Sequence, residues 1–280
     1  MMTPYRSALY IPAANARAME KARSLPADAI IFDLEDAVTP AEKVAARDLL
    51  ARALLSDYGG RARIVRINGL DTEWGEADAR AFARSADAVL IPKVGRGADL
   101  DRAASLIPGT PLWAMMETPC GMLHAAEIAA HPQLAGMVMG SNDLAKDLRA
   151  RFRPDRLPLM TGLGLCLLAA RAHGRIILDG VYNAYRDLSG LRAECEQGRD
   201  MGFDGKTLIH PDQLAIANEV FAPSEDEIVL ARRQIEAFDQ ARAQGKGIAV
   251  LDGRIVENLH VETARATLAM AEAIASRAAQ

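Results

Sequence analysis

The sequence predicts an α/β fold, a TIM (β/α)8 barrel followed by a C-terminal helix–hairpin–helix extension. Eight short apolar segments mostly alternate with helical patterns at a spacing of roughly 25 residues, which indicates βαβ crossovers and a parallel sheet. Eight such units fit a closed barrel. An open doubly wound sheet is the alternative fold. Gly162-Leu-Gly164 does not support it, because no third glycine follows and no strand leads into a dinucleotide loop there.

The elements of the barrel follow one another in order. Short apolar runs bounded by polar or turn residues are typical of strands buried in a parallel sheet. The predicted strands are residues 7–12, 29–32, 63–68, 87–94, 111–118, 136–140, 175–182 and 205–210. The predicted helices are residues 15–25, 40–55, 76–85, 99–106, 122–130, 159–173 and 188–201. The helix at 40–55 has the clearest start, because Pro40 follows Thr39 and occupies the first helical position.

The pattern changes after residue 222. A long charged helix is predicted from 223 to about 244, ended by the glycines on either side of Lys246. Two short apolar segments flank Asp252-Gly253, a strong hairpin signal, and a final helix covers about 260–277. We therefore divide the chain into a catalytic barrel, residues 1–222, and an extension, residues 223–280. The extension is too small to fold alone, so we expect it to pack on the barrel or to cap a neighbouring subunit.

Composition excludes several classes of protein. The 280 residues are 50% hydrophobic and carry a formal net charge of −4, without a basic run, so no general attraction to nucleic acid or to an anionic membrane is expected. The three cysteines are far apart, which argues against a disulfide framework or a zinc site. Because residues 1–6 are short and polar, we expect no signal peptide, and no apolar run approaches the length of a membrane span. We expect a soluble, cytoplasmic protein.

Charged side chains collect at the ends of the predicted strands. The second strand runs into Asp33, Glu35 and Asp36, and carboxylates at a buried strand end must be paired, hydrogen-bonded or bound to a metal. The other polar residues at strand ends are Arg66, Asn68, Lys93, Glu117, Asp143, Asp179 and His210. In a barrel these ends share one rim, where the active site lies.

This set of side chains predicts a magnesium site. Carboxylates without histidine or cysteine spacing suit a hard divalent cation, best Mg²⁺. Arg66 cannot act as a base, so it would bind an anion or stabilise an enolate. Lys93 is expected to form a salt bridge rather than a Schiff base, because the surrounding acids keep its amine protonated. Two alternatives remain: a lattice of salt bridges that fixes the rim, and, for the acids after the second strand, the first turn of a helix.

Eight motifs occur in a characteristic order along nearly the whole chain. They are Arg6-Ser-Ala-Leu-Tyr-Ile-Pro12, Asp33-Leu-Glu-Asp-Ala-Val38, Val65-Arg-Ile-Asn68, Ile91-Pro-Lys93, Glu117-Thr-Pro-Cys-Gly121, Gly140-Ser-Asn-Asp-Leu144, Gly205-Lys-Thr-Leu-Ile-His-Pro211 and the tail hairpin. Together they resemble the family of citrate lyase β-subunits, malyl-CoA lyases and citramalyl-CoA lyases. The resemblance implies a TIM barrel in which Glu117 and Asp143 are the direct Mg²⁺ ligands and Arg66 contacts the substrate and its thioester enolate.

The resemblance implies further roles around this centre. Glu35 and Asp36 would reach the water molecules of the metal. Residues near the phosphates of coenzyme A would be Arg6, Arg17 and Lys21.

The implied reaction is reversible, Mg²⁺-dependent C–C cleavage of a 3-hydroxyacyl-CoA. By resemblance the expected substrate is (S)-citramalyl-CoA, which gives acetyl-CoA and pyruvate. Malyl-CoA lyase and a citrate lyase β-subunit acting on a citryl thioester of acyl-carrier protein are the alternatives within the family. Outside it, the alternatives are a class II aldolase for free keto acids and a non-enzymatic, ligand-binding regulatory barrel.

The tail departs from the family pattern. Family members often carry an aspartate after the hairpin, which reaches the active site of a neighbouring subunit in a trimer. This sequence has Glu257-Asn-Leu-His260 there. A catalytic role of Glu257 and a homo-oligomer, trimer or hexamer, are therefore expectations by resemblance alone. The longer side chain also argues against hydrolysis of the thioester.

Overall fold

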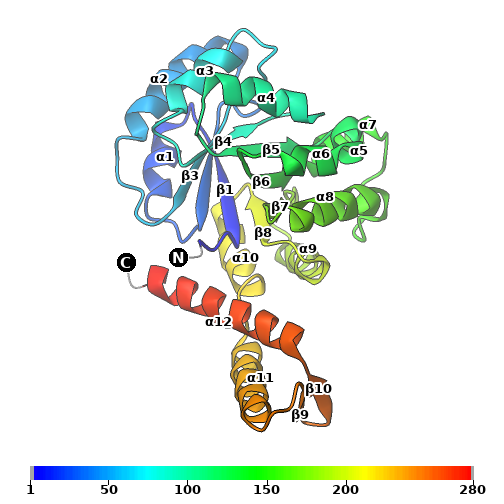
Figure 1. Cartoon of the computed structure of the whole chain (residues 1–280). Coiled ribbons are helices and arrows are strands. Elements are labelled where there is room, and N and C mark those ends of the chain that lie inside the picture. The colour runs from blue at the N-terminus through cyan, green and yellow to red at the C-terminus, as the bar shows by residue number, and fades with distance from the viewer. Residues whose placement is uncertain (1–2, 279–280) are drawn as a thin grey trace. The chain divides into compact units, whose positions relative to one another are not determined.

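Eight parallel strands close into a barrel in the computed structural model, which describes residues 3–278 (Figure 1). Each strand pairs with the next along the chain, and β8 pairs with β1, so the sheet has no free edge. The strands are β1 (Ser7–Pro12), β2 (Ala29–Asp33), β3 (Ala62–Arg66), β4 (Ala88–Ile91), β5 (Leu112–Met116), β6 (Leu134–Met139), β7 (Ile176–Asp179) and β8 (Gly205–Leu208). The predicted TIM barrel is confirmed.

Helices connect the strands and surround the barrel (Figure 1). They are α1 (Ala16–Ala22), α2 (Lys43–Ala53), α3 (Gly75–Phe82), α4 (Gly97–Leu106), α5 (Pro119–Leu123), α6 (Ala125–Ala130), α7 (Ser141–Asp147), α8 (Met160–Ala172), α9 (Leu188–Met201) and α10 (Leu214–Val220). Short 3-10 turns cover Pro40–Glu42, Leu157–Leu159 and Pro211–Gln213. The prediction of one helix at 122–130 was wrong. The chain forms α5 and α6 there, because Thr118 caps a helix that starts at Pro119 and leaves helical geometry at His124.

Residues at alternate strand positions fill the barrel, as the two-residue period of a strand requires. Ile31, Ile64, Leu90 and Trp113 belong to one buried cluster. A Cβ added at Gly136 would lie 2.6 Å from Cδ2 of Trp113, so β6 carries a glycine where the indole occupies the interior. Asp33 and Arg66 follow Ile31 and Ile64 by two residues, so they belong to the same face of their strands and lie at the carboxyl ends.

A buried charged cluster lies in the wall at β7 and β8. Lys206 is fully buried, and its Nζ donates to Asp179 Oδ2 at 2.9 Å and to Glu194 Oε1 at 2.7 Å. Arg156 Nη1 donates to both carboxylate oxygens of Asp179 at 2.7 Å. Burial opposes ionisation of Asp179, but the charges of Lys206 and Arg156 outweigh it and hold its pKa below the ordinary value. This network fixes β7, β8 and the segment before α8 relative to one another.

The C-terminal residues form a separate compact unit. Residues 5–219 make up the barrel unit, and residues 220–278 group with residues 3–4. The second unit contains α11 (Glu225–Ala243), β9 (Ala249–Leu251), β10 (Arg254–Val256) and α12 (Asn258–Ala278). Phe238, Val256 and Val261 share its core. Asp252 and Gly253 both have positive φ, 49° and 75°, as the predicted two-residue hairpin requires. The helix–hairpin–helix extension is thus confirmed.

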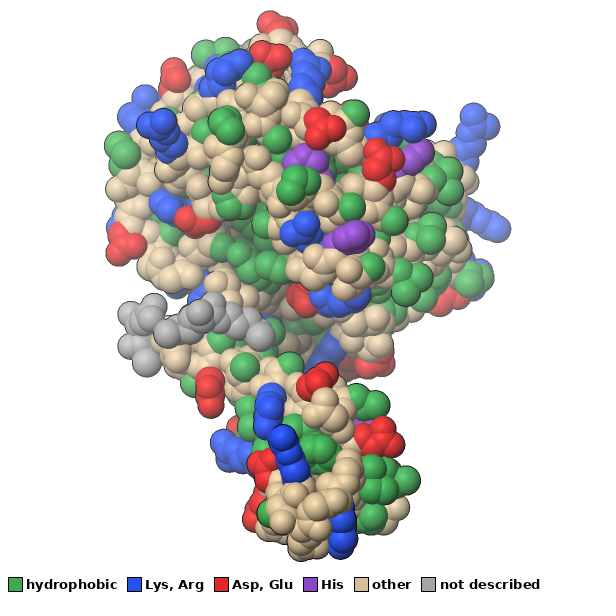
Figure 2. Space-filling model, viewed as in Figure 1, with side chains coloured by type: hydrophobic (Ala, Val, Ile, Leu, Met, Phe, Trp, Pro, Cys, Tyr) green, Lys and Arg blue, Asp and Glu red, His purple; other side chains and the backbone are tan. Residues whose placement is uncertain are grey.

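Surface charge is mixed rather than segregated. Figure 2 shows lysine and arginine side chains interspersed with aspartate and glutamate over the visible face, in keeping with the small net charge of −4. Within residues 3–278, the helices are too short or too polar for any of them to cross a membrane.

We predict that Gly136→Ala destabilises the barrel, because its Cβ would meet the indole of Trp113 at 2.6 Å in a filled interior. The expected loss is about 1–3 kcal/mol in the free energy of unfolding, measured by urea denaturation. Gly164→Ala in α8 is the matched control, since nothing lies within 4 Å of its added Cβ. That variant should be neutral or more stable by about 0.5–1 kcal/mol. Equal stability of the two variants would contradict this packing account.

Candidate active site

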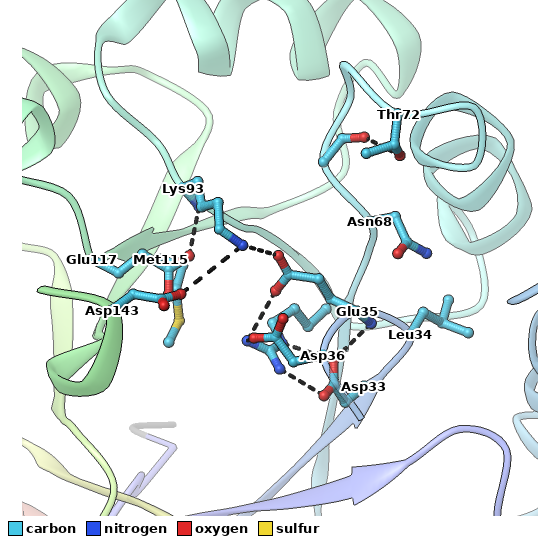
Figure 3. A network of polar contacts seen from close by, with 12 residues as sticks. Asp33, Leu34, Glu35, Asp36, Asn68, Thr72, Lys93, Met115, Glu117 and Asp143 are labelled. Atoms are coloured by element: carbon cyan, nitrogen blue, oxygen red, sulfur yellow. Dashed lines mark hydrogen bonds and ion pairs between the residues drawn. The ribbon is translucent and has the colours of Figure 1, made fainter. Parts of the chain in front are cut away.

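Polar side chains lie at the carboxyl ends of several strands, after the apolar residues that fill the barrel, and they share one rim (Figure 3). Asp33 is the last residue of β2, Arg66 is the last residue of β3, and Glu117 follows β5. All three are at least 90% buried, at 2%, 7% and 2% exposure. The chain therefore places desolvated charges at the end of its barrel where catalytic residues gather in this fold.

Arg66 is held on several sides. Its Nε donates to Asp33 Oδ1 at 2.8 Å and its Nη2 to Asp33 Oδ2 at 2.6 Å, a bidentate pair. Its guanidinium lies over the ring of Tyr10, 5.1 Å from the centroid. Burial disfavours the charge, but Asp33 and other acidic neighbours keep the pKa of Arg66 well above its usual value. Arg66 is thus a fixed positive charge, which suits binding of an anion.

Glu117 is a buried carboxylate with one hydrogen bond in the described part of the chain. Its Oε1 accepts the backbone N–H of Lys93 at 2.8 Å. Burial, reinforced by the nearby carboxylate of Glu35, raises the pKa of Glu117 to about 7. A Cβ added at Gly140 would lie 2.6 Å from Glu117 Oε2, so only glycine leaves room for this carboxylate at the end of β6.

Asp143 reaches the same cavity from the first turn of α7, which starts directly after Gly140. Its side chain is 30% exposed. The cavity has a volume of about 420 Å³, and Glu117, Asp143, Arg66 and Asp36 all line it. The carboxylate that follows β5 and the carboxylate of α7 therefore face one cavity, beside the guanidinium at the end of β3.

The loop after β2 supplies the next carboxylates. Glu35 is buried, and its Oε1 accepts from Lys93 Nζ at 2.6 Å. Its Oε2 lies 3.0 Å from Arg66 Nη1 but without hydrogen-bond geometry. Burial raises the pKa of Glu35 despite these cations. Asp36 is exposed and lines the cavity. Buried Lys43 fixes the loop by donating to the backbone oxygens of Leu34 and Glu35.

A second cavity of about 430 Å³ adjoins the first on the side of β6 and β7. Ser141, Asn142 and Val181 line both cavities. The amides of Asn142 and Asn183 hydrogen-bond to each other at 2.7 and 3.2 Å, which joins the two loops at this boundary. The rim therefore has room for a molecule longer than a small hydroxy acid.

The residues present fit magnesium. In residues 3–278 no group of three or more histidine, cysteine or acidic side chains forms a ready-made metal cage. Mg²⁺ is usually bound by one or two carboxylates and completes its shell with water and substrate. Glu117 and Asp143 are such a pair, and the raised pKa of Glu117 shows that the charges of Arg66 and Lys93 do not offset the burial of this carboxylate.

Other residues predicted for the site lie elsewhere. Arg6 precedes β1, at the opposite end of the barrel, and its guanidinium pairs with Asp28 at 2.9 Å, so the structure does not bring it to the cavity. Arg17 and Lys21 lie on exposed positions of α1. Glu257 lies in the second unit, exposed, just before α12.

Sequence reasoning missed two contributors. Tyr10 packs under Arg66, and its signal was its place in the interior series of β1. Gly140 was read only as part of a motif, because its role depends on the position of Glu117 on a different strand. Lys93 forms the predicted salt bridge, and its partner is Glu35 in the loop after β2.

Comparison with known proteins gives consistent matches. The model of the HpcH/HpaI aldolase/citrate lyase family matches residues 6–211. A (3S)-malyl-CoA thioesterase of Cereibacter sphaeroides is 70% identical over 275 residues, covering 98% of this chain and 96% of that protein. Citrate lyase subunit beta of Escherichia coli is 36% identical over 281 residues, covering 95% and 93%.

A solved structure resembles the whole chain. The crystal structure of CitE from Mycobacterium tuberculosis in complex with magnesium, acetoacetate and coenzyme A matches with a TM-score of 0.81 at 31% identity. The match covers 96% of this chain and 98% of that one.

We predict that binding of Mg²⁺ weakens as the pH falls below about 7, because Glu117 must lose its proton before it can hold a cation. Below that pH the affinity should fall by up to about tenfold per pH unit, measured by calorimetric titration with MgCl₂. Glu117→Gln should fold and bind Mg²⁺ at least about 100-fold more weakly, as loss of a metal ligand implies. Affinity that does not change between pH 8 and pH 6, or a Glu117→Gln variant with normal affinity, would refute the role of this carboxylate.

Proposed function

The chain belongs to the HpcH/HpaI aldolase/citrate lyase family, and from that premise we propose that it is a Mg²⁺-dependent enzyme that hydrolyses (3S)-malyl-CoA to malate and coenzyme A. The observation that carries the reaction class is the convergence of Glu117, Asp143 and Arg66 on one cavity. The choice of thioester follows the 70% identity to a (3S)-malyl-CoA thioesterase.

This proposal replaces two expectations from the tail of the sequence. (S)-Citramalyl-CoA was the expected substrate, whereas four relatives of 69–70% identity are named for malyl-CoA. Glu257 was taken to argue against hydrolysis, yet those relatives are named thioesterases. An exchange of one acid for another at an exposed position is weaker evidence than similarity over 98% of the chain.

The carboxylates would hold the cation, and the cation would orient the acyl group. Glu117 and Asp143 are the proposed ligands, with Glu35 and Asp36 beside them. Mg²⁺ held there would supply a Lewis acid, and the carboxylate and 3-hydroxyl of a malyl group are suited to coordinate it. Mg²⁺ and coenzyme A are both present in the CitE complex of M. tuberculosis, which supports the same ligands here.

Arg66 would stabilise the charge that develops at the thioester oxygen. Its guanidinium is buried, already aligned by Asp33 and Tyr10, and needs no reorganisation during the reaction. Attack of water on the thioester carbon breaks the C–S bond and releases the thiolate of coenzyme A and the new carboxylate of malate. Asp36 is the exposed carboxylate in this cavity and is our candidate to accept the proton of the attacking water.

The rest of the thioester extends from the cavity. Exposed Arg17 and Lys21 on α1 remain our proposed contacts for the phosphates of coenzyme A, and the adjoining cavity offers further room. A homo-oligomer in which Glu257 serves a neighbouring subunit stays a prediction, and so does a cytoplasmic location.

C–C cleavage is the second candidate function, supported by the citrate lyase β-subunits at 34–36% identity. Both reactions start from the same bound thioester, so the products distinguish them. Hydrolysis releases a free thiol and malate, whereas cleavage releases acetyl-CoA and glyoxylate without a free thiol.

We predict that the purified enzyme releases free thiol and malate from (3S)-malyl-CoA in stoichiometric amounts and only with Mg²⁺. A thiol reagent and a phenylhydrazine assay for 2-oxo acids are run on the same reaction. Citramalyl-CoA and citryl-CoA are the comparison substrates, and EDTA should abolish thiol release. Asp143→Asn should lower turnover by at least about 100-fold in a folded protein, as expected for a metal ligand. Formation of glyoxylate without free thiol would show that the enzyme is a lyase and not a thioesterase. Absence of turnover with all three thioesters would refute the proposal that the protein acts on CoA thioesters.

A further inference from the structure

Lys93 is placed by an unusual backbone conformation. It follows β4 and Pro92, and its φ of 52° lies in the left-handed region that a lysine rarely adopts. This turn directs its N–H to Glu117 Oε1 at 2.8 Å. Strained backbone of this kind persists where the surrounding structure determines it, often at functional sites.

The side chain of Lys93 extends from this turn toward two further carboxylates (Figure 3). Its Nζ donates to Glu35 Oε1 at 2.6 Å and lies 4.0 Å from Asp143 Oδ2. Within residues 3–278, Lys93 is the only cation within 4.0 Å of the Asp143 carboxylate. One residue therefore contacts three acids, which come from the loop after β2, from the position after β5 and from α7.

The other cation of the site is already committed. Arg66 donates two hydrogen bonds to Asp33, and its Nη1 forms ion pairs with Glu35 and Asp36. Lys93 therefore supplies the positive charge beside Asp143, and together with Arg66 it partly offsets the burial of Glu117. The ammonium and a bound Mg²⁺ would share the same acidic neighbours, so each must weaken the hold of those acids on the other.

We propose that Lys93 is a positioning residue and the built-in counter-ion of the carboxylate site, and that its charge sets how tightly the site binds Mg²⁺. The inference rests on the magnesium site of the proposed function. It assigns Lys93 two separable tasks. The backbone N–H orients Glu117, and the ammonium, bound to Glu35 and 4.0 Å from Asp143, limits the affinity of these acids for the cation.

The test compares Mg²⁺ affinity in variants of the full chain by calorimetric titration with MgCl₂. Lys93→Met keeps the backbone N–H and removes the charge, so it should bind Mg²⁺ about fivefold or more tightly than wild type, as removal of a nearby like charge predicts. Lys93→Gly should share this gain while also relieving the left-handed strain. Lys93→Arg keeps the charge and should stay within about twofold of wild type.

Lys146→Met is the matched control. Lys146 is an exposed lysine on α7, the helix that carries Asp143, and no carboxylate in residues 3–278 pairs with it within 4.0 Å. Its removal changes the net charge equally and should leave Mg²⁺ affinity and turnover unchanged. A general charge effect would appear in both Met variants.

Two further readouts separate positioning from mere structural support. Without Mg²⁺, Lys93→Met should melt at a lower temperature than wild type, and saturating Mg²⁺ should raise its Tm by more than it raises that of wild type. Turnover of (3S)-malyl-CoA at saturating Mg²⁺ should fall by at least about tenfold with little change in KM, because Glu35 loses its partner. A purely structural role would weaken metal binding and turnover together.

The outcomes are distinct. Lys93→Met binding Mg²⁺ as wild type does, or more weakly, in a folded protein overturns the proposal. Tighter Mg²⁺ binding in Lys93→Met and Lys93→Gly, with the affinity of Lys93→Arg and Lys146→Met near that of wild type, supports the proposal. This conclusion holds even if the wild-type enzyme does not hydrolyse malyl-CoA. Absence of hydrolysis would refute the proposed function and leave the role of Lys93 intact.

Discussion

Burial of Glu117 is the constraint on which the rest of the site depends. A carboxylate at 2% exposure with a single hydrogen bond is costly to keep ionised, and its pKa of about 7 expresses that cost. The barrel supports it through groups from other strands. Gly140 leaves space beside it, and the left-handed turn at Lys93 brings a donor to it. A divalent cation shared with Asp143 would complete the compensation.

The pairing of Arg66 with Asp33 provides the opposite charge in the same rim. The last residues of β2 and β3 lie side by side in register, so the bidentate pair is a direct consequence of strand pairing. Tyr10 from β1 packs against a face of the guanidinium. The cavity thus presents a rigid cation on one side and carboxylates that lack full compensation on the other. This polarity suits a substrate that is both an anion and a metal chelator.

Much of this arrangement was accessible from the sequence. Apolar runs of strand length, which mostly alternate with helical patterns, predicted all eight strands, and the acids after them located the rim. Residues whose role depends on a contact between strands were not predictable. Asp179 was predicted to belong to the rim, yet it is fully buried and paired with Lys206 and Arg156. These pairs depend on the three-dimensional packing of β7 and β8, so the sequence could not distinguish Asp179 from the cavity residues. Short helices such as α7 show too few apolar residues to display a period.

The central claim is that Glu117 and Asp143 together bind one divalent cation. Mn²⁺ has a strong anomalous signal and the same preference for oxygen ligands as Mg²⁺, so crystals grown with MnCl₂ test the claim directly. We expect one anomalous peak within about 2.0–2.3 Å of a carboxylate oxygen of each residue, displaced by excess Mg²⁺. A peak that touches neither residue, or an empty cavity at saturating Mn²⁺, would contradict the account.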